Sequence, residues 1–209
     1  MSKGKLFIFS GPSGIGKDTV LKEIVNSCDD IKLSISSITR NMREGEVEGE
    51  KYHFISKEEF QELIKNDELL EYNEYVGNFY GTPKAPVLKW LDEGFNVILE
   101  IDVNGAFKVK EKMPEAIMVF MLPTSFDVLR HRLEKRGTEN EEVIQKRLKQ
   151  AAKEISFAKE YDYLFFNDVL EEAVSDFKSI IRVQPETLLN ENMNDDMRKV
   201  IEDAKSINW

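Results

Sequence analysis

The sequence is poor in the residues that build disulfide frameworks and metal centres. Its 209 residues include one cysteine, Cys28, and two histidines, His53 and His131. A single cysteine cannot form an intramolecular disulfide, so a reducing compartment, most simply the cytoplasm, is expected. The two histidines are far apart in sequence and lack the spacing of metal ligands, so no zinc site is predicted.

Long hydrophobic runs and positive charge are also scarce. No apolar run approaches the roughly 20 residues that a membrane-spanning helix needs, so no membrane partner is expected. The first apolar segment, "KLFIFS" at residues 5–10, is too short for a signal peptide and runs into a glycine-rich loop, which favours a strand. Lysine and arginine number 29 against 39 aspartates and glutamates, a formal net charge of −10. A broad basic face for nucleic acid is therefore not expected.

The chain does contain a phosphate-binding loop in "SGPSGIGKDT", residues 10–19. A β-forming run precedes the loop and helical spacing follows it, which is the context of a nucleoside triphosphate site. Its glycines let the backbone approach a polyphosphate, and its lysine can reach the β- and γ-phosphates. The loop and the first helical turn consist of Gly11, Pro12, Ser13, Gly14, Ile15, Gly16, Lys17, Asp18 and Thr19.

Strand-like and helical segments alternate along most of the chain, which predicts an α/β fold with a parallel sheet flanked by helices. The expected strands are residues 5–10, 32–37, 95–102, 116–123 and 162–168, and the expected helices are residues 17–25, 56–67, 83–94, 125–137, 139–161 and 170–182.

A polar, glycine-punctuated segment at residues 33–82 interrupts this alternation. It includes two strand-like runs around Gly77-Asn78, which is typical of a hairpin. We interpret the segment as an inserted mixed-β subdomain that binds the substrate. After Pro185 the composition becomes polar, and residues 186–209 are expected to form an added helix or a loose tail.

Five blocks together identify a family: "SGPSGIGK", "SISSITRNMREGEVEGEKYHF", "EYNEYVGNFYGTP", "ILEIDVNGA" and "RLEKRGTENEEVIQKRL". In this order, over about residues 4–183, they closely resemble guanylate kinases. The resemblance implies a transferase of purine nucleotide metabolism that moves the γ-phosphoryl group of ATP to GMP, and to dGMP, with Mg²⁺ arriving on ATP. It also implies a domain at residues 4–185 with a P-loop core (4–32 and 83–185), a GMP-binding subdomain (33–82) and a helical lid (132–150).

The resemblance assigns the acceptor site. Glu71 matches the carboxylate that accepts hydrogen bonds from the N1–H and 2-amino groups of guanine; adenine offers one donor and one acceptor there. On its residues alone, Glu71 would be interpreted as a solvated glutamate on an edge strand. Ser36 and Thr82 match supporting base contacts, and the remaining GMP-binding residues implied are Arg40, Arg43, Tyr52, Tyr80, Gly81, Glu100 and Asp102.

The donor site follows in the same way. The loop and first-turn residues 11–19 are implied to bind ATP, together with Arg132, Arg136 and Asn167. Lys17, Arg136 and Arg147 are the implied catalytic residues, because phosphoryl transfer depends on positioning and charge neutralisation. The arginines of residues 132–150 could also belong to a helix-surface ladder of ion pairs, with Glu134, Glu139, Glu141 and Glu142 as partners.

Position 18 departs from the usual phosphate loop, in which Ser or Thr follows the lysine and binds Mg²⁺. Here Asp18 follows Lys17 and Thr19 comes next, so "GKDT" is similar to the "GKGT" of nucleoside monophosphate kinases. Asp18, Thr19 and Asp102 are candidates for metal contact, and none is assigned as a direct ligand. We expect retained activity, with the effect of Asp18 on ATP affinity and metal preference left open.

Two other functions are compatible with parts of the sequence. A catalytically silent guanylate-kinase-like binding module would accommodate the unusual Asp18, although the lysine and the expected clamp residues are all present. A kinase for another nucleoside monophosphate is the second alternative, and Glu71 argues against AMP. A monomer or a homodimer is expected, with no feature that decides between them.

Overall fold

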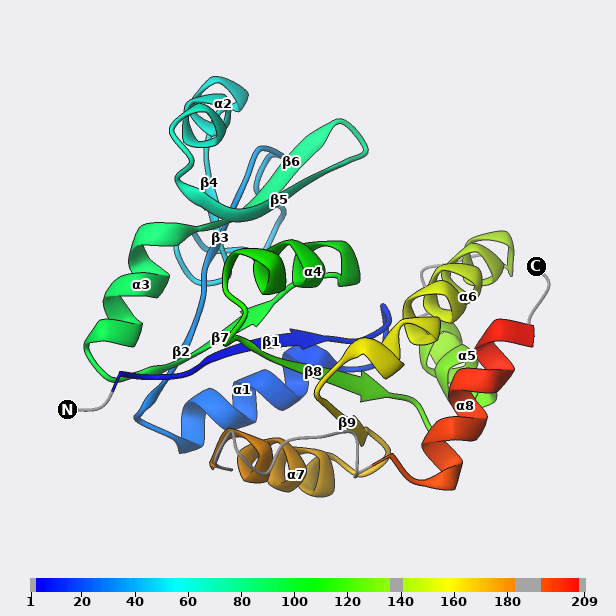
Figure 1. Ribbon diagram of the computed structural model, residues 1–209. Coiled ribbons are helices and arrows are strands. Elements are labelled where there is room, and N and C mark those ends of the chain that lie inside the picture. The colour runs from blue at the N-terminus through cyan, green and yellow to red at the C-terminus, as the bar shows by residue number, and fades with distance from the viewer. Residues whose placement is uncertain (1–2, 136–140, 183–192, 207–209) are drawn as a thin grey trace. The chain divides into compact units, whose positions relative to one another are not determined.

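The computed structural model describes residues 3–135, 141–182 and 193–206, and the chain forms two compact units (Figure 1). The first unit comprises Met1–Ile8 and Asp30–Ala116, and the second comprises Phe9–Asp29 and Ile117–Trp209. Strand β1 (Leu6–Ser10) contributes its first residues to the first unit and its last residues to the second.

The first unit begins with parallel strands. β2 (Ile31–Leu33) pairs in parallel with β7 (Asn96–Glu100), and the strand order is β2-β7-β1. The middle residues of β7 are completely buried, as expected for a parallel strand covered on both faces. Helix α3 (Lys84–Asp92) packs against β7 and buries Val87 and Leu91.

A four-stranded mixed sheet forms the rest of the first unit, in the order β4-β3-β6-β5. β3 (Ser36–Ile38) pairs in parallel with β4 (Tyr52–Phe54) and antiparallel with β6 (Asn78–Pro83), which pairs antiparallel with β5 (Leu69–Tyr75). Val76 and Gly77 turn the β5–β6 hairpin with φ values of 50° and 71°, the left-handed pair that suits a two-residue hairpin loop.

Two helices cover the mixed sheet. Helix α2 (Lys57–Lys65) begins with a capping box between Ser56 and Glu59, and its buried Phe60 packs on the sheet. Helix α4 (Val103–Lys112) lies along β5, as Figure 1 shows. The Lys112 ammonium donates to the Leu69 carbonyl (3.0 Å), which fastens the end of α4 to the start of β5.

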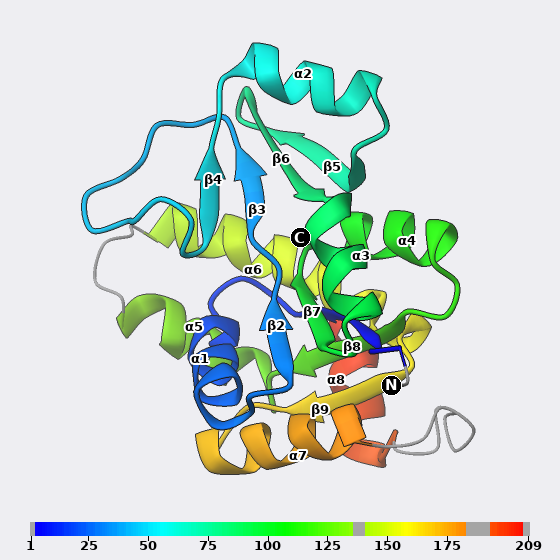
Figure 2. The same ribbon diagram turned by 90° about the vertical axis from the view of Figure 1, so that its left-hand side faces the viewer.

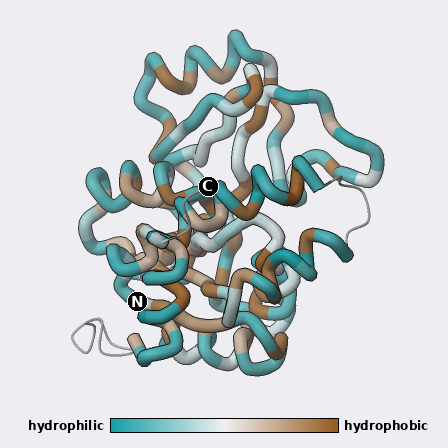
Figure 3. The backbone as a smooth tube through the Cα atoms, turned by 90° about the vertical axis from the view of Figure 1, so that its right-hand side faces the viewer, coloured by the Kyte–Doolittle hydropathy of each residue, from teal (hydrophilic) through white to brown (hydrophobic). Residues whose placement is uncertain are grey.

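The second unit has the strand order β1-β8-β9, with β8 (Ile117–Leu122) parallel to β9 (Tyr163–Phe166). Helices α1 (Lys17–Ser27) and α7 (Leu170–Arg182) pack side by side, as can be followed in Figure 2. In Figure 3 the helical coils of the tube alternate between hydrophobic and hydrophilic residues.

The remaining helices of the second unit follow from β8 and β9. α5 (Phe126–Lys135) precedes α6 (Glu141–Ser156), and a short 3₁₀ turn, η1 (Ala158–Glu160), leads into β9. Helix α8 (Asp195–Ser206) packs against α6 through an apolar face. That face consists of Met197, Val200, Ile201 and Ala204.

The expected fold class is confirmed: the fold is α/β, with parallel strands flanked by helices and an additional mixed sheet. Three local expectations were wrong. Residues 32–37 form the ends of two strands in different sheets, the hairpin turns at Val76-Gly77 rather than at Gly77-Asn78, and Asp102 lies beyond the strand that was expected to reach it. Within the described parts of the chain, every helix is too short or too polar to cross a membrane.

Aromatic packing stabilises the core of the second unit. The centre of the Phe9 ring lies 4.6 Å from the centre of the Phe177 ring and 6.0 Å from the centre of the Phe165 ring. All three side chains are buried. Replacing Phe177 by alanine removes a ring and leaves a cavity that the neighbouring rings cannot fill. We therefore expect Phe177→Ala to lower the free energy of unfolding by about 3–5 kcal/mol in urea denaturation.

The matched control for this substitution is Ser175→Ala, at an exposed position of the same helix. Its effect should stay within about 0.5 kcal/mol, as for most surface changes. Equal losses for the two variants would contradict a core role for Phe177.

Candidate active site

The phosphate loop follows β1 and leads directly into α1. Gly14 and Gly16 have φ values of 87° and 101°, a region that side chains other than glycine rarely adopt. A Cβ atom on Gly11 would lie 2.8 Å from the Met121 carbonyl oxygen, so space rather than backbone conformation requires glycine there. The sequence thus needs these three glycines to form the loop.

Gly16 is the N-cap of α1, and it offers no side-chain acceptor to the first N–H groups of the helix. These groups and the helix dipole suit an anion. The Lys17 ammonium folds back over the loop and donates to the Gly11 carbonyl at 2.7 Å. Asp18 and Thr19 follow on the exposed side of the first turn. The site therefore combines backbone donors, one cation and two exposed oxygen-bearing side chains.

Arg132 and Asn167 meet at the backbone of the loop. The Asn167 amide donates to the Ile15 carbonyl (2.6 Å), the Arg132 guanidinium donates to the same carbonyl (2.9 Å), and Arg132 also donates to the Asn167 carbonyl. Asn167 is buried and Ile15 is completely buried. Both predicted ATP-binding residues thus hold the loop in place, a role that the sequence did not indicate.

The structure describes only one of the other two predicted arginines. Arg147 is a partly buried residue of α6, whereas Arg136 lies outside the described residues. The expected ladder of ion pairs is present but is built on Arg130, whose guanidinium contacts Glu134 (2.8 Å) and Glu141 (2.7 Å). Lys146 and Glu142 add a further pair at 2.8 Å, and Glu139 lies outside the described residues.

Glu71 occupies a nearly dry position on β5. Only 6% of the residue is exposed, although β5 is an edge strand. Thr82, opposite it on β6, donates its hydroxyl to Oε1 of the carboxylate at 2.7 Å. The interpretation of Glu71 as a solvated surface glutamate is therefore wrong, and Thr82 contacts the carboxylate.

Burial raises the pKa of the Glu71 carboxyl to about 7. The hydrogen bond from Thr82 opposes this shift, the negative charge of Asp102 adds to it, and the positive charge of Lys108 reduces it. A buried carboxyl whose pKa lies near neutrality is a common mark of a functional site.

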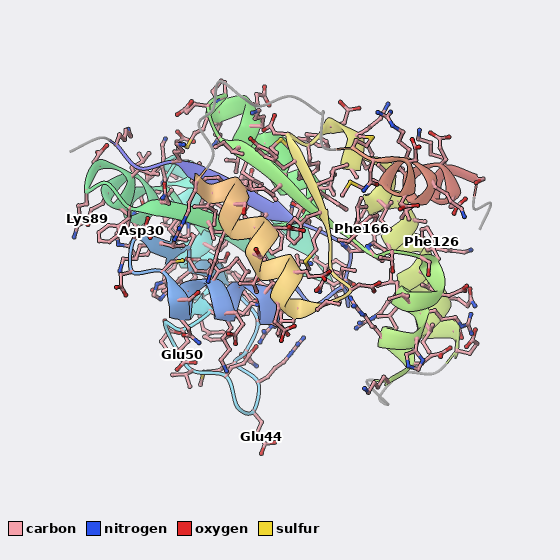
Figure 4. The ribbon with its side chains drawn as sticks, turned by 90° about the horizontal axis from the view of Figure 1, so that it is seen from below. Asp30, Glu44, Glu50, Lys89, Phe126 and Phe166 are labelled. Carbon is pink, nitrogen blue, oxygen red and sulfur yellow. The ribbon has the colours of Figure 1, made fainter. Side chains whose placement is uncertain are left out.

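Arg40 is held by a carboxylate of its own loop. Its guanidinium makes two parallel hydrogen bonds to Glu46 (2.6 and 2.5 Å) and lies 5.4 Å from the Tyr52 ring centre. The Arg40 guanidinium, with a backbone N–H from Arg43, lowers the pKa of the Glu46 carboxyl to about 2. Figure 4 shows Glu44 at the tip of this loop, pointing outward. The Arg43 side chain is exposed, and Tyr80 on β6 is half-buried.

A small cavity of about 90 Å³ brings predicted residues together. Ser36, Tyr52 and Glu100 line it, with Leu33, Ser34 and Lys51 completing the wall. The Lys51 ammonium lies 3.4 Å from the Glu100 carboxylate. Gly81 and Thr82 are buried in the neighbouring strand β6. The sequence analysis did not predict Glu46 or Lys51 as residues of this site. The signal that could have found them is their position in the sequence: Glu46 lies close to Arg43, and Lys51 directly precedes Tyr52.

Asp102 is the N-cap of α4, because its Oδ1 accepts a hydrogen bond from the Gly105 N–H at 2.7 Å. Both of its carboxylate oxygens also accept from the Asn73 amide, at 3.2 and 3.3 Å. The structure thus gives Asp102 a structural role that its expected place on a strand did not suggest.

A larger hollow of about 1020 Å³ lies between α2 and the mixed sheet. Its walls include Ile55, Leu63 and Pro83, and none of the predicted nucleotide-binding residues lines it. The predicted nucleotide-binding residues therefore lie outside this hollow, despite its greater size. Among the residues that the structure describes, no group of three or more His, Cys, Asp or Glu side chains is placed to hold a metal ion.

The raised pKa of Glu71 predicts a stability cost for its ionised form. In the unfolded chain the carboxyl pKa is near 4.5, so this cost is absent below pH 4.5, grows as pH rises, and is complete above pH 7. Glu71→Gln removes it, so this variant should exceed the parent in free energy of unfolding by up to about 3 kcal/mol at pH 8. Urea denaturation at pH 5, 6, 7 and 8 measures the difference.

Glu74→Gln is the control, because Glu74 is exposed on the same strand. Its difference from the parent should change little over this pH range. A pH-independent difference for Glu71→Gln would contradict the assigned burial cost.

Comparisons with known proteins agree with this arrangement. The family model for guanylate kinase matches residues 3–184. A guanylate kinase of Lactobacillus acidophilus is 49% identical over 202 residues, covering 96% of this chain and 98% of that protein. A guanylate kinase of Oceanobacillus iheyensis is 46% identical over 204 residues, covering 98% of each chain.

A solved structure shows the same likeness. The crystal structure of guanylate kinase from Anaplasma phagocytophilum has a TM-score of 0.71 and 34% sequence identity, covering 96% of this chain and 95% of the other. The resemblance drawn from the five sequence blocks is thereby confirmed. The chain belongs to the guanylate kinase family.

Proposed function

We propose that this guanylate kinase, which transfers the γ-phosphoryl group of ATP to GMP, selects guanine through the Glu71 carboxylate. The observation that supports this most is the burial of Glu71 with Oε1 oriented by Thr82. Guanine presents two adjacent donors, which a carboxylate accepts together, whereas adenine would place a lone pair against a lone pair. A buried polar group left unpaired gives strong rejection of the wrong base.

Only the ionised carboxylate can accept both donors. Because the pKa of Glu71 lies at about 7, a substantial share of the carboxyl is protonated at neutral pH, and GMP binding releases that proton. The same base edge is present in dGMP, which we propose as a second acceptor.

The acceptor phosphate is assigned to the basic and phenolic groups of the mixed sheet and its loop. Arg40 would exchange the Glu46 carboxylate for phosphate oxygens, which offer its guanidinium the same two-point geometry. Arg43, Tyr52 and Tyr80 add donors around it. Ser36 and Glu100, in the cavity beside Tyr52, face the same ligand.

The donor nucleotide is assigned to the phosphate loop. The backbone N–H groups of residues 11–19, apart from Pro12, which has none, and the N-terminus of α1 would hold the polyphosphate. Lys17 would leave the Gly11 carbonyl for the β- and γ-phosphates. Arg147 and Arg136 are the proposed cations for the transferring group, and Arg132 and Asn167 position the loop.

The residues after Lys17 fit a magnesium ion that arrives with ATP. Asp18 and Thr19 offer exposed carboxylate and hydroxyl oxygens at the start of α1, the hard donors that Mg²⁺ prefers. When bound, Mg²⁺ neutralises charge on the β- and γ-phosphates. Asp102 is a weaker candidate, because the Gly105 N–H and the Asn73 amide already occupy its oxygens.

We also propose a cytoplasmic location, where the buried thiol of Cys28 would stay reduced. For the oligomeric state, the prediction stays that the protein is a monomer or a homodimer.

Acceptor specificity tests the role of Glu71. A coupled assay of ADP release with GMP, dGMP, AMP, UMP and CMP should show GMP and dGMP as the substrates of the parent. Glu71→Gln should lose at least about 100-fold in kcat/KM for GMP, because the amide turns a donor toward a donor. Glu74→Gln should match the parent, and a Glu71→Gln variant with unchanged selectivity would refute the assignment.

The role of Asp18 is tested by replacing it with glycine. Removing an oxygen donor should raise the Mg²⁺ concentration required for half-maximal activity several-fold, while kcat at saturating Mg²⁺ stays close to the parent value. Steady-state assays at graded Mg²⁺ and fixed ATP measure both. Glu23→Gln removes a charge elsewhere on α1 and serves as control. Identical Mg²⁺ dependence of parent and Asp18→Gly would mean that Asp18 has no part in metal handling.

A further inference from the structure

We propose that Gly105 is a specificity-positioning residue for guanine recognition: its lack of a side chain leaves the space in which the Glu71 carboxylate is held. The inference rests on the proposed recognition of guanine by Glu71 and extends it to a residue that does not touch the nucleotide.

The space at Gly105 is already filled by the carboxylate. A Cβ atom on Gly105 would lie 2.9 Å from Oε2 of Glu71 and 3.2 Å from its Cδ. Real Cβ atoms essentially never approach another atom this closely, so a side chain at position 105 would have to shift either the Glu71 carboxylate or helix α4.

Backbone conformation does not explain this glycine. Gly105 lies in the first turn of α4, where its N–H donates to the Asp102 side chain, and its φ is not positive. Alanine is more favourable than glycine inside a helix. Glycine at position 105 therefore lowers the stability of the helix but leaves room for Oε2 of Glu71.

The carboxylate cannot move freely to relieve a clash. Its other oxygen, Oε1, is held by the Thr82 hydroxyl at 2.7 Å, and the residue is only 6% exposed. Glu71 thus lies between β6 on one side and the first turn of α4 on the other. A methyl group at position 105 would turn or shift the carboxylate plane away from its bond to Thr82.

Helix α4 cannot move away either, because it is fastened to β5 on both sides of Gly105. Before it in sequence, Asp102 accepts from the Asn73 amide. After it, the Lys108 ammonium donates to the Tyr72 carbonyl (2.5 Å) and to Oδ1 of Asn73 (2.8 Å). The Asn73 amide therefore joins a cation and an anion of α4, and β5 and α4 move as one piece.

Displacement of the carboxylate should affect selectivity more than catalysis. Two-point acceptance from guanine needs both oxygens in line with N1–H and the 2-amino group. The hypoxanthine of IMP keeps N1–H and lacks the 2-amino group, so it measures the second bond alone. The proposed phosphate-binding residues are elsewhere, so bound GMP should still react.

Gly105→Ala tests the inference. We expect KM for GMP to rise at least about tenfold, kcat to stay within about threefold, and the preference for GMP over IMP to fall at least about tenfold. KM for ATP should stay close to the parent value. Asn104→Ala, an exposed residue of the same helical turn, is the control and should match the parent.

A double-mutant cycle shows whether the contact itself is responsible. Glu71→Asp removes one methylene and withdraws the carboxylate from Gly105. In that background Gly105→Ala should change KM for GMP by no more than about twofold. An equal effect of Gly105→Ala in both backgrounds would overturn the proposal. If Gly105→Ala folds poorly, the same cycle is measured in urea, and failure of Glu71→Asp to restore the midpoint would also overturn it.

Failure of this inference can be distinguished from failure of the proposed function. If Glu71→Gln leaves selectivity for GMP intact, recognition by Glu71 is wrong. If Glu71→Gln destroys that selectivity while Gly105→Ala leaves the GMP-to-IMP ratio unchanged, recognition by Glu71 stands and the positioning role of Gly105 is wrong.

Discussion

The structure depends most on the burial of one carboxylate. Glu71 loses hydration on β5, and hydrogen bonding from Thr82 does not offset that loss, so its ionised form is disfavoured in the folded protein. A base with two adjacent donors would supply the hydrogen bonds that the Glu71 carboxylate lost when it was removed from water. The unfavourable ionisation and the proposed selectivity for guanine thus have the same cause, and a better-solvated carboxylate would discriminate less.

The two proposed nucleotide sites are constructed in different ways. The phosphate loop is a backbone structure: glycines shape it, and two side chains, the half-buried Arg132 and the buried Asn167, hold it at the Ile15 carbonyl. The acceptor side relies on side chains whose charges are balanced internally, as in Arg40 with Glu46. In the proposed sites, a polyphosphate would meet a backbone that is already in place and would need only Lys17 to move, whereas a monophosphate would have to displace the Glu46 carboxylate from Arg40.

Local features of the sequence predicted the fold and the phosphate loop well, because strand, loop and helix are contiguous there. Glu71 needed the family resemblance, since its own neighbours suggested a solvated edge strand. Arg132 was assigned to ATP from the family resemblance, and its contact with the loop could not be predicted because the contact spans 117 positions and leaves no local trace in the sequence. Helix α4 was missed although Asp102 is a good N-cap, because Gly105 lowers helix propensity in its first turn.

Helix α8 has a consequence for how α6 can respond to nucleotides. It lies beyond the 3–184 span of the family match, yet it shares a continuous apolar contact with the helix that bears Arg147. Any rotation of α6 must therefore either move α8 with it or separate the two apolar helix faces. A spectroscopic label on the outward side of α8, for example at Arg198, would report such a rotation from outside the catalytic residues.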